Sequence, residues 1–383
     1  MNKLTKISLA VAATLLSLSV MAASTVADAR GNGMGNTGVT TADFLLAPFY
    51  NPALTAVSRD NDDFGLLLPA VGASVRDSDD TLSTLDDLQD TIDAFENSGS
   101  VDISDAATLN DYLNQLEDDS ALNASVGAGV AVAVPTRMLS VNLFARGYAE
   151  IIAIPNITAD LGDNPINVRT RYESSSVRTI AFGYGEFGAA MAKQFMIAGQ
   201  QFSFGVAPKY QQMKTYKEDI SVQDYDIEDF DQSETSKSAF NMDLGAVWLL
   251  DEFRAGLAVK DLFSQEIDTI DKQNQYKLDT QVTISGAYVS EFFTATLDWD
   301  LTKQTRFSGV DDDTRFLRVG VEGNAWGWAQ LRAGYQIDTE DTLDNTVTAG
   351  IGISPADVVS LDVSAAYAGE NEFGASVNLA LTF

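Results

Sequence analysis

The final residues of the chain alternate between apolar and polar side chains at every second position. Alternation with a period of two predicts a β-strand whose two faces meet different environments. A strand at the edge of a soluble sandwich and a strand of a membrane barrel both satisfy this pattern, so the rest of the chain has to distinguish them. One face carries Phe373, Ala375, Val377, Leu379, Leu381 and Phe383, and the other carries Gly374, Ser376, Asn378, Ala380 and Thr382.

Thirteen further segments upstream have the composition or alternation of strands. Most of them reach the length of about ten residues that a tilted strand needs to cross a bilayer. In 293–301, for example, Phe293, Leu297 and Trp299 alternate with acidic or hydroxyl side chains. The fourteen segments are 64–76, 122–134, 138–152, 175–197, 201–216, 237–249, 253–262, 277–289, 292–304, 314–324, 328–338, 345–353, 357–368 and 372–383.

The connections between these segments are of two kinds. Six are tight turns, and the other seven are longer and mostly acidic, in strict alternation. Outer-membrane barrels have short periplasmic turns and long external loops, whereas a soluble sandwich has no reason to sort its loops in this way. The sequence therefore predicts an all-β fold, a transmembrane antiparallel up-and-down barrel of about fourteen strands with both termini on the periplasmic side.

The N-terminus has the features of a secretory signal peptide. Lys3 and Lys6 precede an apolar core that is too short for a spanning helix, and small residues allow cleavage after Ala22. We expect residues 1–22 to be removed, 23–62 to form a plug, and 63–383 to form the barrel, with 77–120 as a helical insert. The predicted location is the outer membrane of a Gram-negative bacterium.

Composition excludes several classes of chemistry. The 383 residues include no cysteine and no histidine, which removes thiol chemistry, histidine catalysis and the usual zinc sites. The net charge of -31 argues against a nucleic-acid partner. We therefore expect no catalytic residue, no cofactor and no metal site, and we do not expect an enzyme.

Residues 23–62 do not alternate and are rich in glycine. Gly31, Gly33 and Gly35 permit close approach of the backbone and positive φ angles. A phosphate-binding loop is a poor interpretation of these glycines, because no strand precedes them and no Lys-Ser/Thr pair follows. The segment is better interpreted by what it resembles.

The stretch ARGxxMGxTGVxxAD at 29–43, with Asn51-Pro52-Ala53 after it, resembles the mature N-terminus of FadL-like outer-membrane proteins. It is most similar to the barrel family labelled conjugal-transfer TraF-like; the thioredoxin-like TraF shares only the label, since its chemistry needs cysteine. In FadL-type transporters this segment is a plug inside the lumen. The resemblance implies plug or gate roles here for Arg30, Gly31, Gly33, Gly35, Asn51, Pro52 and Ala53.

Charged and aromatic residues share the predicted inner face of the barrel. One interpretation is a structural ladder of ion pairs, because charges in a barrel interior must be paired or hydrated. Another is a ligand surface with apolar contacts and a charge for orientation. Plug packing, or a bulge near Gly183 and Gly185, remains an alternative. The candidate lumen residues are Phe144, Arg146, Tyr148, Arg178, Phe182, Tyr184, Arg254, Arg318 and Arg332.

Two acidic segments interrupt the strands. Residues 77–119 hold fourteen Asp or Glu and no Lys or Arg, and leucines recur at helical spacing, which predicts an external helical hairpin capped by Ser78 and Ser104. Residues 218–236 add eight acids. They lack the spacing of an EF-hand, so a solvated acidic loop is the simpler interpretation than weak divalent-ion binding.

The resemblance implies an outer-membrane barrel that binds or passively transports hydrophobic or amphipathic small molecules. The expected partners are the bilayer with its lipopolysaccharide, the barrel assembly machinery, which would recognise Phe383 as its signal, and a hydrophobic small-molecule ligand; we expect a monomer. The alternative is a non-transporting surface protein linked to conjugation or attachment through its acidic loops. An apolar path through the lumen favours transport, and a lumen filled by plug and ion pairs favours the alternative.

Overall fold

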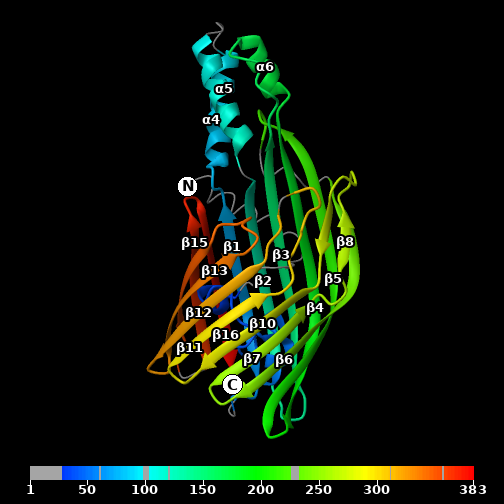
Figure 1. The fold of residues 1–383 in the computed structure, drawn as a ribbon, viewed down its shortest axis with the longest axis vertical. Helices are drawn as coiled ribbons and strands as arrows, with labels where there is room; N and C mark the ends of the chain where they lie inside the picture. Colours follow the sequence, from blue (N-terminus) through cyan, green and yellow to red (C-terminus); the bar gives the residue numbers. More distant parts are fainter. Residues whose placement is uncertain are drawn as a thin grey trace.

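The computed structural model describes residues 28–59, 62–97, 103–119, 121–225, 233–310, 312–355 and 358–383. Within them, fourteen strands form one closed antiparallel barrel, in which β1 pairs with β16 (Figure 1). The predicted fold class is confirmed. The wall consists of β1 (Gly65–Arg76), β2 (Leu122–Val134), β3 (Ser140–Asn156), β4 (Ser176–Ile197), β5 (Gln200–Ser221), β6 (Thr235–Leu250), β7 (Phe253–Lys260), β10 (Gln281–Val289), β11 (Phe293–Asp300), β12 (Phe316–Ala325), β13 (Ala329–Asp338), β14 (Thr346–Ile353), β15 (Val359–Gly369) and β16 (Glu372–Thr382).

Side chains of the wall alternate between the lumen and the outside, as the sequence pattern predicts. In β4, Phe187 is 61% exposed on the outside, whereas the adjacent Glu186 is buried in the lumen. β3 and β4 pair without a register shift, so the bulge considered near Gly183 and Gly185 does not occur. A bulge lies instead in β1 at Pro69, which has no N–H to donate to a neighbouring strand.

Tight turns join the strands at one end of the barrel. Ala198 and Gly199 between β4 and β5 have φ angles of 52° and 78°, and two successive positive φ angles match the right-handed twist of a hairpin. Long connections join the strands at the other end, with one exception. β15 and β16 are joined through Glu370 and Asn371 alone, so the predicted strict alternation of tight and long connections fails at this last link.

Three helices extend beyond the end with the long connections (Figure 1). They are α4 (Thr81–Asn97), α5 (Ile103–Asp118) and α6 (Pro165–Glu173), and they share a buried apolar cluster. Asp77, not Ser78, caps α4, because its carboxylate accepts the N–H groups of Thr81 and Leu82. The Ser78 hydroxyl donates to Glu372 on β16. Sequence patterns did not predict α6, which is capped by Asn164 and has a proline in its first turn.

A second unpredicted element is the hairpin of β8 (Gln265–Asp268) and β9 (Gln275–Leu278) in the connection from β7 to β10. Tyr276 of this hairpin bridges to Phe307 in the connection from β11 to β12. The two connections therefore pack on each other. Their short polar strands give no extended alternation, which explains why they were missed.

None of the described helices is long and apolar enough to cross a membrane. The predicted signal peptide lies outside the described residues, as does the acidic stretch 226–232.

Candidate functional site: the barrel lumen

The N-terminal segment, residues 28–57, lies inside the barrel near the tight turns (Figure 1, blue). Phe49 and Leu54 are buried and pack with small wall residues such as Ala131 and Ala190. The rings of Phe49 and Phe144 meet edge to face, with centroids 6.2 Å apart. The segment comprises α2 (Ala29–Gly33), α3 (Ala47–Tyr50) and the 3-10 turn η1 (Pro52–Ala56).

Local contacts explain the glycines of this segment. The Asp28 carboxylate caps α2 by accepting the N–H groups of Arg30 and Gly31. Tyr50 donates its hydroxyl hydrogen to the same carboxylate at 3.1 Å, so a Cβ at Gly31 would lie 1.8 Å from the Tyr50 oxygen. Gly35 has a φ of 71°, which disfavours other residues.

Glycines of the barrel wall face the segment at its closest contacts. A Cβ at Gly334 would lie 2.0 Å from the backbone nitrogen of Gly35, and one at Gly205 would lie 2.4 Å from that of Ala53. Backbone therefore packs on backbone, and no side chain fits between them. Gly320 faces the Met34 carbonyl in the same way, whereas Gly245 and Gly256 face the side chains of Asn51 and Thr40.

Arg30 joins the segment to an ion-pair ladder on the wall. Its Nη2 lies 2.9 Å from Glu322 Oε1, and its Nε donates to Oε2 at 3.0 Å. Arg332 contacts the same Glu322 at 2.6 Å and Asp362 at 2.6 Å. Arg30 and Arg332 thus share one carboxylate, which ties the segment to β12, β13 and β15.

The Asn51-Pro52-Ala53 turn is also held by the wall and the segment. Asn51 donates its side-chain amide to the Val39 carbonyl at 2.9 Å, and its oxygen accepts the Ala53 N–H at 3.0 Å. The Ser203 hydroxyl donates to the Ala53 carbonyl at 2.6 Å. These residues are fixed in a closed arrangement, and their role in gating stays a prediction.

A buried ionic cluster lies on β3 to β7, close to the segment. Lys209 contacts Glu186, Asp243 and Asp261 at 3.2, 2.8 and 2.8 Å, and Arg146 contacts Glu186 at 2.5 Å. Each of these charges has an opposite partner, as burial away from water requires. In the described part of the chain, no group of acidic residues is arranged to hold a metal ion.

An aromatic cluster covers β3 and β4 farther toward the long connections. Phe182 stacks on Tyr276 of β9 with centroids 3.4 Å apart, and Tyr276 meets Phe307 edge to face at 5.0 Å. Tyr148 and Tyr184 are buried in the same cluster. The sequence placed Tyr148, Phe182 and Tyr184 on one inner face, which agrees with this arrangement, but it gave no sign of the loop aromatics that cover them.

The remaining lumen candidates separate into two groups. Arg254 donates to the Thr40 carbonyl at 3.0 Å, and Arg318 pairs with Asp300 at 2.9 Å, so both face the lumen. Arg178 does not join them. It lies at the end of β4 next to a long connection, with 38% of its side chain exposed, because the barrel no longer encloses the strand there.

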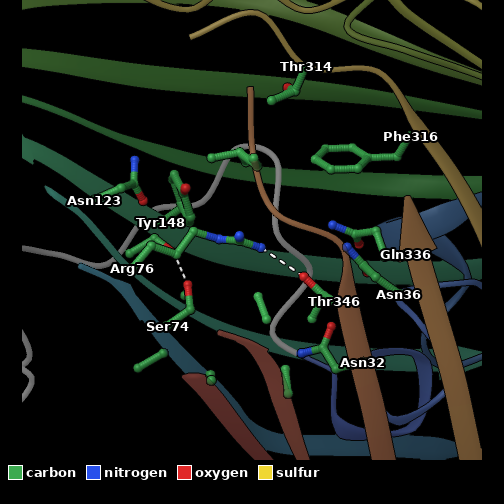
Figure 2. A pocket seen from close by; sticks show the side chains of 18 of the residues that line it. Asn32, Asn36, Ser74, Arg76, Asn123, Tyr148, Thr314, Phe316, Gln336 and Thr346 are labelled. Carbon is green, nitrogen blue, oxygen red and sulfur yellow. Dashed lines mark hydrogen bonds between the residues drawn. The ribbon is translucent and has the colours of Figure 1, made fainter. Parts of the chain in front are cut away.

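A cavity of about 190 Å³ lies in the lumen between the N-terminal segment and the long connections (Figure 2). Asn32 and Asn36 of the segment line it, as do Tyr148 and Arg318, two of the predicted lumen residues. Most of its other residues were not predicted from the sequence, and many of them lie near strand ends or in the long connections. Arg76, Tyr276, Arg306 and Gln336 are examples.

The chain ends against the first strand. The Phe383 backbone exchanges hydrogen bonds with Phe64, and the two rings lie 6.4 Å apart. Phe383 is 56% exposed on the outside of the barrel. Recognition of this residue by the assembly machinery stays a prediction.

The carboxyl group of Asp312, which lies in a loop outside the strands, has a shifted pKa. Asp312 lies between β11 and β12, and burial raises its pKa to about 6, although Arg306 and two backbone N–H groups act in the opposite direction. Those N–H groups, from Arg306 and Phe307, donate to the carboxyl at 3.0 and 2.6 Å. The folded loop therefore holds a proton on Asp312 more tightly than an unfolded chain would.

Comparison with known proteins gives a family and a fold. The family model described as "F plasmid transfer operon, TraF, protein" matches residues 48–300. No curated protein matches the chain. Similar solved structures include the Ralstonia pickettii toluene transporter TbuX and the CymD monoaromatic hydrocarbon channel. Each is 10% identical, with a TM-score of 0.52, and the match covers 93% of this chain and 97% of the other. At this identity the likeness shows a shared fold, and the FadL-like architecture expected from the sequence is confirmed.

Proposed function

The chain belongs to the family described as "F plasmid transfer operon, TraF, protein", and from this premise we propose that it is an outer-membrane barrel that binds small hydrophobic or amphipathic molecules and passes them through a plugged lumen. Residues 29–54 are the plug in this proposal. The helices α4 to α6 lie outside the cell, and both termini face the periplasm, since the tight turns lie at the opposite end.

The observation that carries the proposal is the position of the cavity. It lies directly against Asn32 and Asn36 of the N-terminal segment, so a molecule bound there contacts the part of the chain that closes the lumen. Movement of this segment would connect the cavity to the periplasmic end. The solved barrels of the same fold named above are a toluene transporter and a monoaromatic hydrocarbon channel, which supports passage of small ring compounds.

A gate in this proposal has to move a segment that the wall holds firmly. The segment packs with the wall in an apolar cluster, faces wall glycines and makes many hydrogen bonds to wall side chains, and Arg30 links it to the ladder. Asn51, Pro52 and Ala53 end the path at the tight-turn side. Release of the segment therefore requires several of these contacts to change together.

The competing function is a non-transporting surface protein. The ionic cluster around Lys209 and the aromatic cluster around Tyr276 fill much of the lumen, which favours this alternative. It predicts that the segment serves only to pack the barrel. The acidic helices would then be the functional surface.

One experiment separates the two functions. We expect detergent-purified protein to carry co-purified apolar or amphipathic molecules detectable by mass spectrometry. Liposomes containing a variant that lacks residues 29–54 should take up small ring compounds faster than liposomes containing the wild type. If no such molecule is bound and the two proteins give equal uptake, the transport proposal is wrong and the alternative stands.

A further inference from the structure

We propose that the lumen cavity binds a neutral molecule of about the size of one aromatic ring that carries a hydroxyl group, in preference to a hydrocarbon. This inference rests on the proposed function and narrows its ligand. It follows from the volume, the hydrogen-bonding groups and the charges of the cavity wall.

The volume suits one ring. The cavity measures about 190 Å³, and an apolar protein cavity of about 150 Å³ holds a benzene molecule. A single substituted ring therefore fits in the cavity. Tyr148, Tyr276 and Phe316 supply aromatic surface on the wall.

Three amide side chains on the wall have no hydrogen-bond partner in the described residues. They are Asn36 on the N-terminal segment, Asn123 on β2 and Gln336 on β13 (Figure 2). A primary amide has two donor hydrogens and one acceptor oxygen. The Asn36 Oδ1 has no partner within the described chain but is buried from solvent, so we expect Asn36 to bond a ligand through its amide hydrogens.

A hydrocarbon in this cavity would displace water from these amides and replace none of its hydrogen bonds. Sites built with polar groups reject ligands that leave those groups unpaired, often by large factors. A hydroxyl group donates one hydrogen bond and accepts others, so it suits a wall that offers both kinds of group. The hydroxyl group of a ring compound can bond one of these amides while the apolar face of the ring lies against the aromatic residues.

The charges of the wall favour a neutral ligand. Arg76, Arg306 and Arg318 line the cavity, and each already holds a carboxylate, at N–O distances of 2.7, 2.8 and 2.9 Å. Lys277 and Asp279 add one charge of each sign. No excess positive charge is left to offset the desolvation of an anionic ligand.

The test compares toluene, p-cresol and p-toluate, which share one ring and differ in one substituent. Binding to the full-length protein in detergent is measured by saturation-transfer NMR. We expect p-cresol to bind with a Kd at least about tenfold lower than those of toluene and p-toluate, because only its substituent is both neutral and hydrogen-bonding. Equal or tighter binding of toluene or p-toluate would overturn the inference.

Variants on one strand locate the site. Gln336→Leu removes a cavity amide, and Gln330→Leu makes the same change on β13 outside the cavity. We expect the first to abolish the preference for p-cresol and the second to leave it unchanged. Ser125→Trp fills the cavity from β2 and should remove binding; p-cresol that still binds to this variant is bound elsewhere, and the inference fails.

The failures of the two proposals are distinguishable. Tight toluene binding together with faster uptake by the variant lacking residues 29–54 rejects the hydroxylated ligand and keeps the transport function. No binding of any of the three probes, together with unchanged uptake, rejects both.

Discussion

The two halves of the lumen are built on different principles. Near the tight turns, the N-terminal segment packs backbone against wall glycines, with Phe49 and Leu54 buried among small apolar side chains. Near the long connections, amide and charged side chains surround a cavity of about 190 Å³, covered by loops that Tyr276 and Phe307 hold in place. One half is filled by close packing, and the other holds a cavity lined by groups that need polar partners.

This difference supports the proposal that one barrel can hold a plug and still bind a ligand. Close backbone packing leaves no room for a molecule, and a small displacement is enough to lose it. Polar walls tolerate water and small molecules, because hydrogen-bonding groups keep their partners when solvent enters. Substitutions can therefore alter each half of the lumen separately.

The largest effect is expected from a wall glycine that faces the segment. A side chain at Gly320 would lie 2.4 Å from the Met34 carbonyl oxygen, so Gly320→Leu should push the segment away. We expect roughly tenfold or greater conductance in planar bilayers, since overpacking forces the backbone to shift. Gly323→Leu on the same strand is the control, because a Cβ there meets no atom within 4 Å. Equal conductance of the two variants contradicts close packing as the means of closure.

The position of the loops that cover the cavity, which contain Tyr276 and Phe307, should depend strongly on Phe182. Phe182→Ala removes the ring that stacks on Tyr276, and loss of a buried aromatic side chain costs about 3–5 kcal/mol. We expect faster trypsin cleavage at Lys272 and Lys277, measured by mass spectrometry. The barrel itself should keep its heat-dependent mobility on gels. Phe187→Ala, which changes an exposed ring on the same strand, should not alter cleavage; if it does so equally, the cover does not depend on the stack.

A smaller effect is expected from the link at Arg30. Arg30→Gln removes an ion pair whose partners are 19% and 10% exposed, which should loosen the segment by about 1–3 kcal/mol. Because the chain has no cysteine, a single cysteine introduced as Ala42→Cys reports how often the segment becomes exposed. Its labelling by a thiol reagent should accelerate roughly tenfold or more.

The control for this experiment is an exposed ion pair. Arg315 and Glu340 lie 2.9 Å apart with 38% and 22% of their side chains exposed, so Arg315→Gln should change the labelling rate little. An equal effect of the two substitutions would mean that loss of positive charge, and not loss of the link, is responsible.

The smallest effect concerns pH and the loop cover. The pKa of Asp312 is about 6 in the folded loop against an ordinary value of 3.8, so the folded loop binds a proton more readily than the unfolded one. Its contribution to loop stability is complete below pH 3.8 and is lost as pH rises through about 6. Amide exchange of residues 304–310, corrected for intrinsic rates, should therefore be slower at pH 5 than at pH 7.5. In Asp312→Asn the pH difference should vanish; a difference that persists would assign it to another group.

Much of the barrel could be predicted from the sequence, because its wall has a strict period. The inner positions of Arg146, Arg332 and Asp298 follow from alternation alone, and the two arginines pair with Glu186 and Glu322 on neighbouring strands. Arg178 shows the limit of this reasoning. Alternation gives its face correctly, but the height at which the barrel stops enclosing β4 depends on the neighbouring loops.

The site was predicted less completely than the wall. Arg30 and the glycines at 31, 33 and 35 came from the family resemblance, and their contacts came from the structure. Tyr276, Phe307 and Arg306 lie in the connections between wall strands, which have no repeating pattern, so no local signal marks them as lumen residues. Their positions depend on loops folding back into the barrel, which is a non-local event.

The sequence by itself determined that the chain is a closed antiparallel barrel and which face of each strand turns inward, because the bilayer and the lumen impose opposite polarities on alternate residues. The tertiary structure alone decided where the lumen is filled and where it is open. That choice depends on contacts between residues about 300 positions apart, such as Gly35 with Gly334, and no local pattern of side chains encodes them.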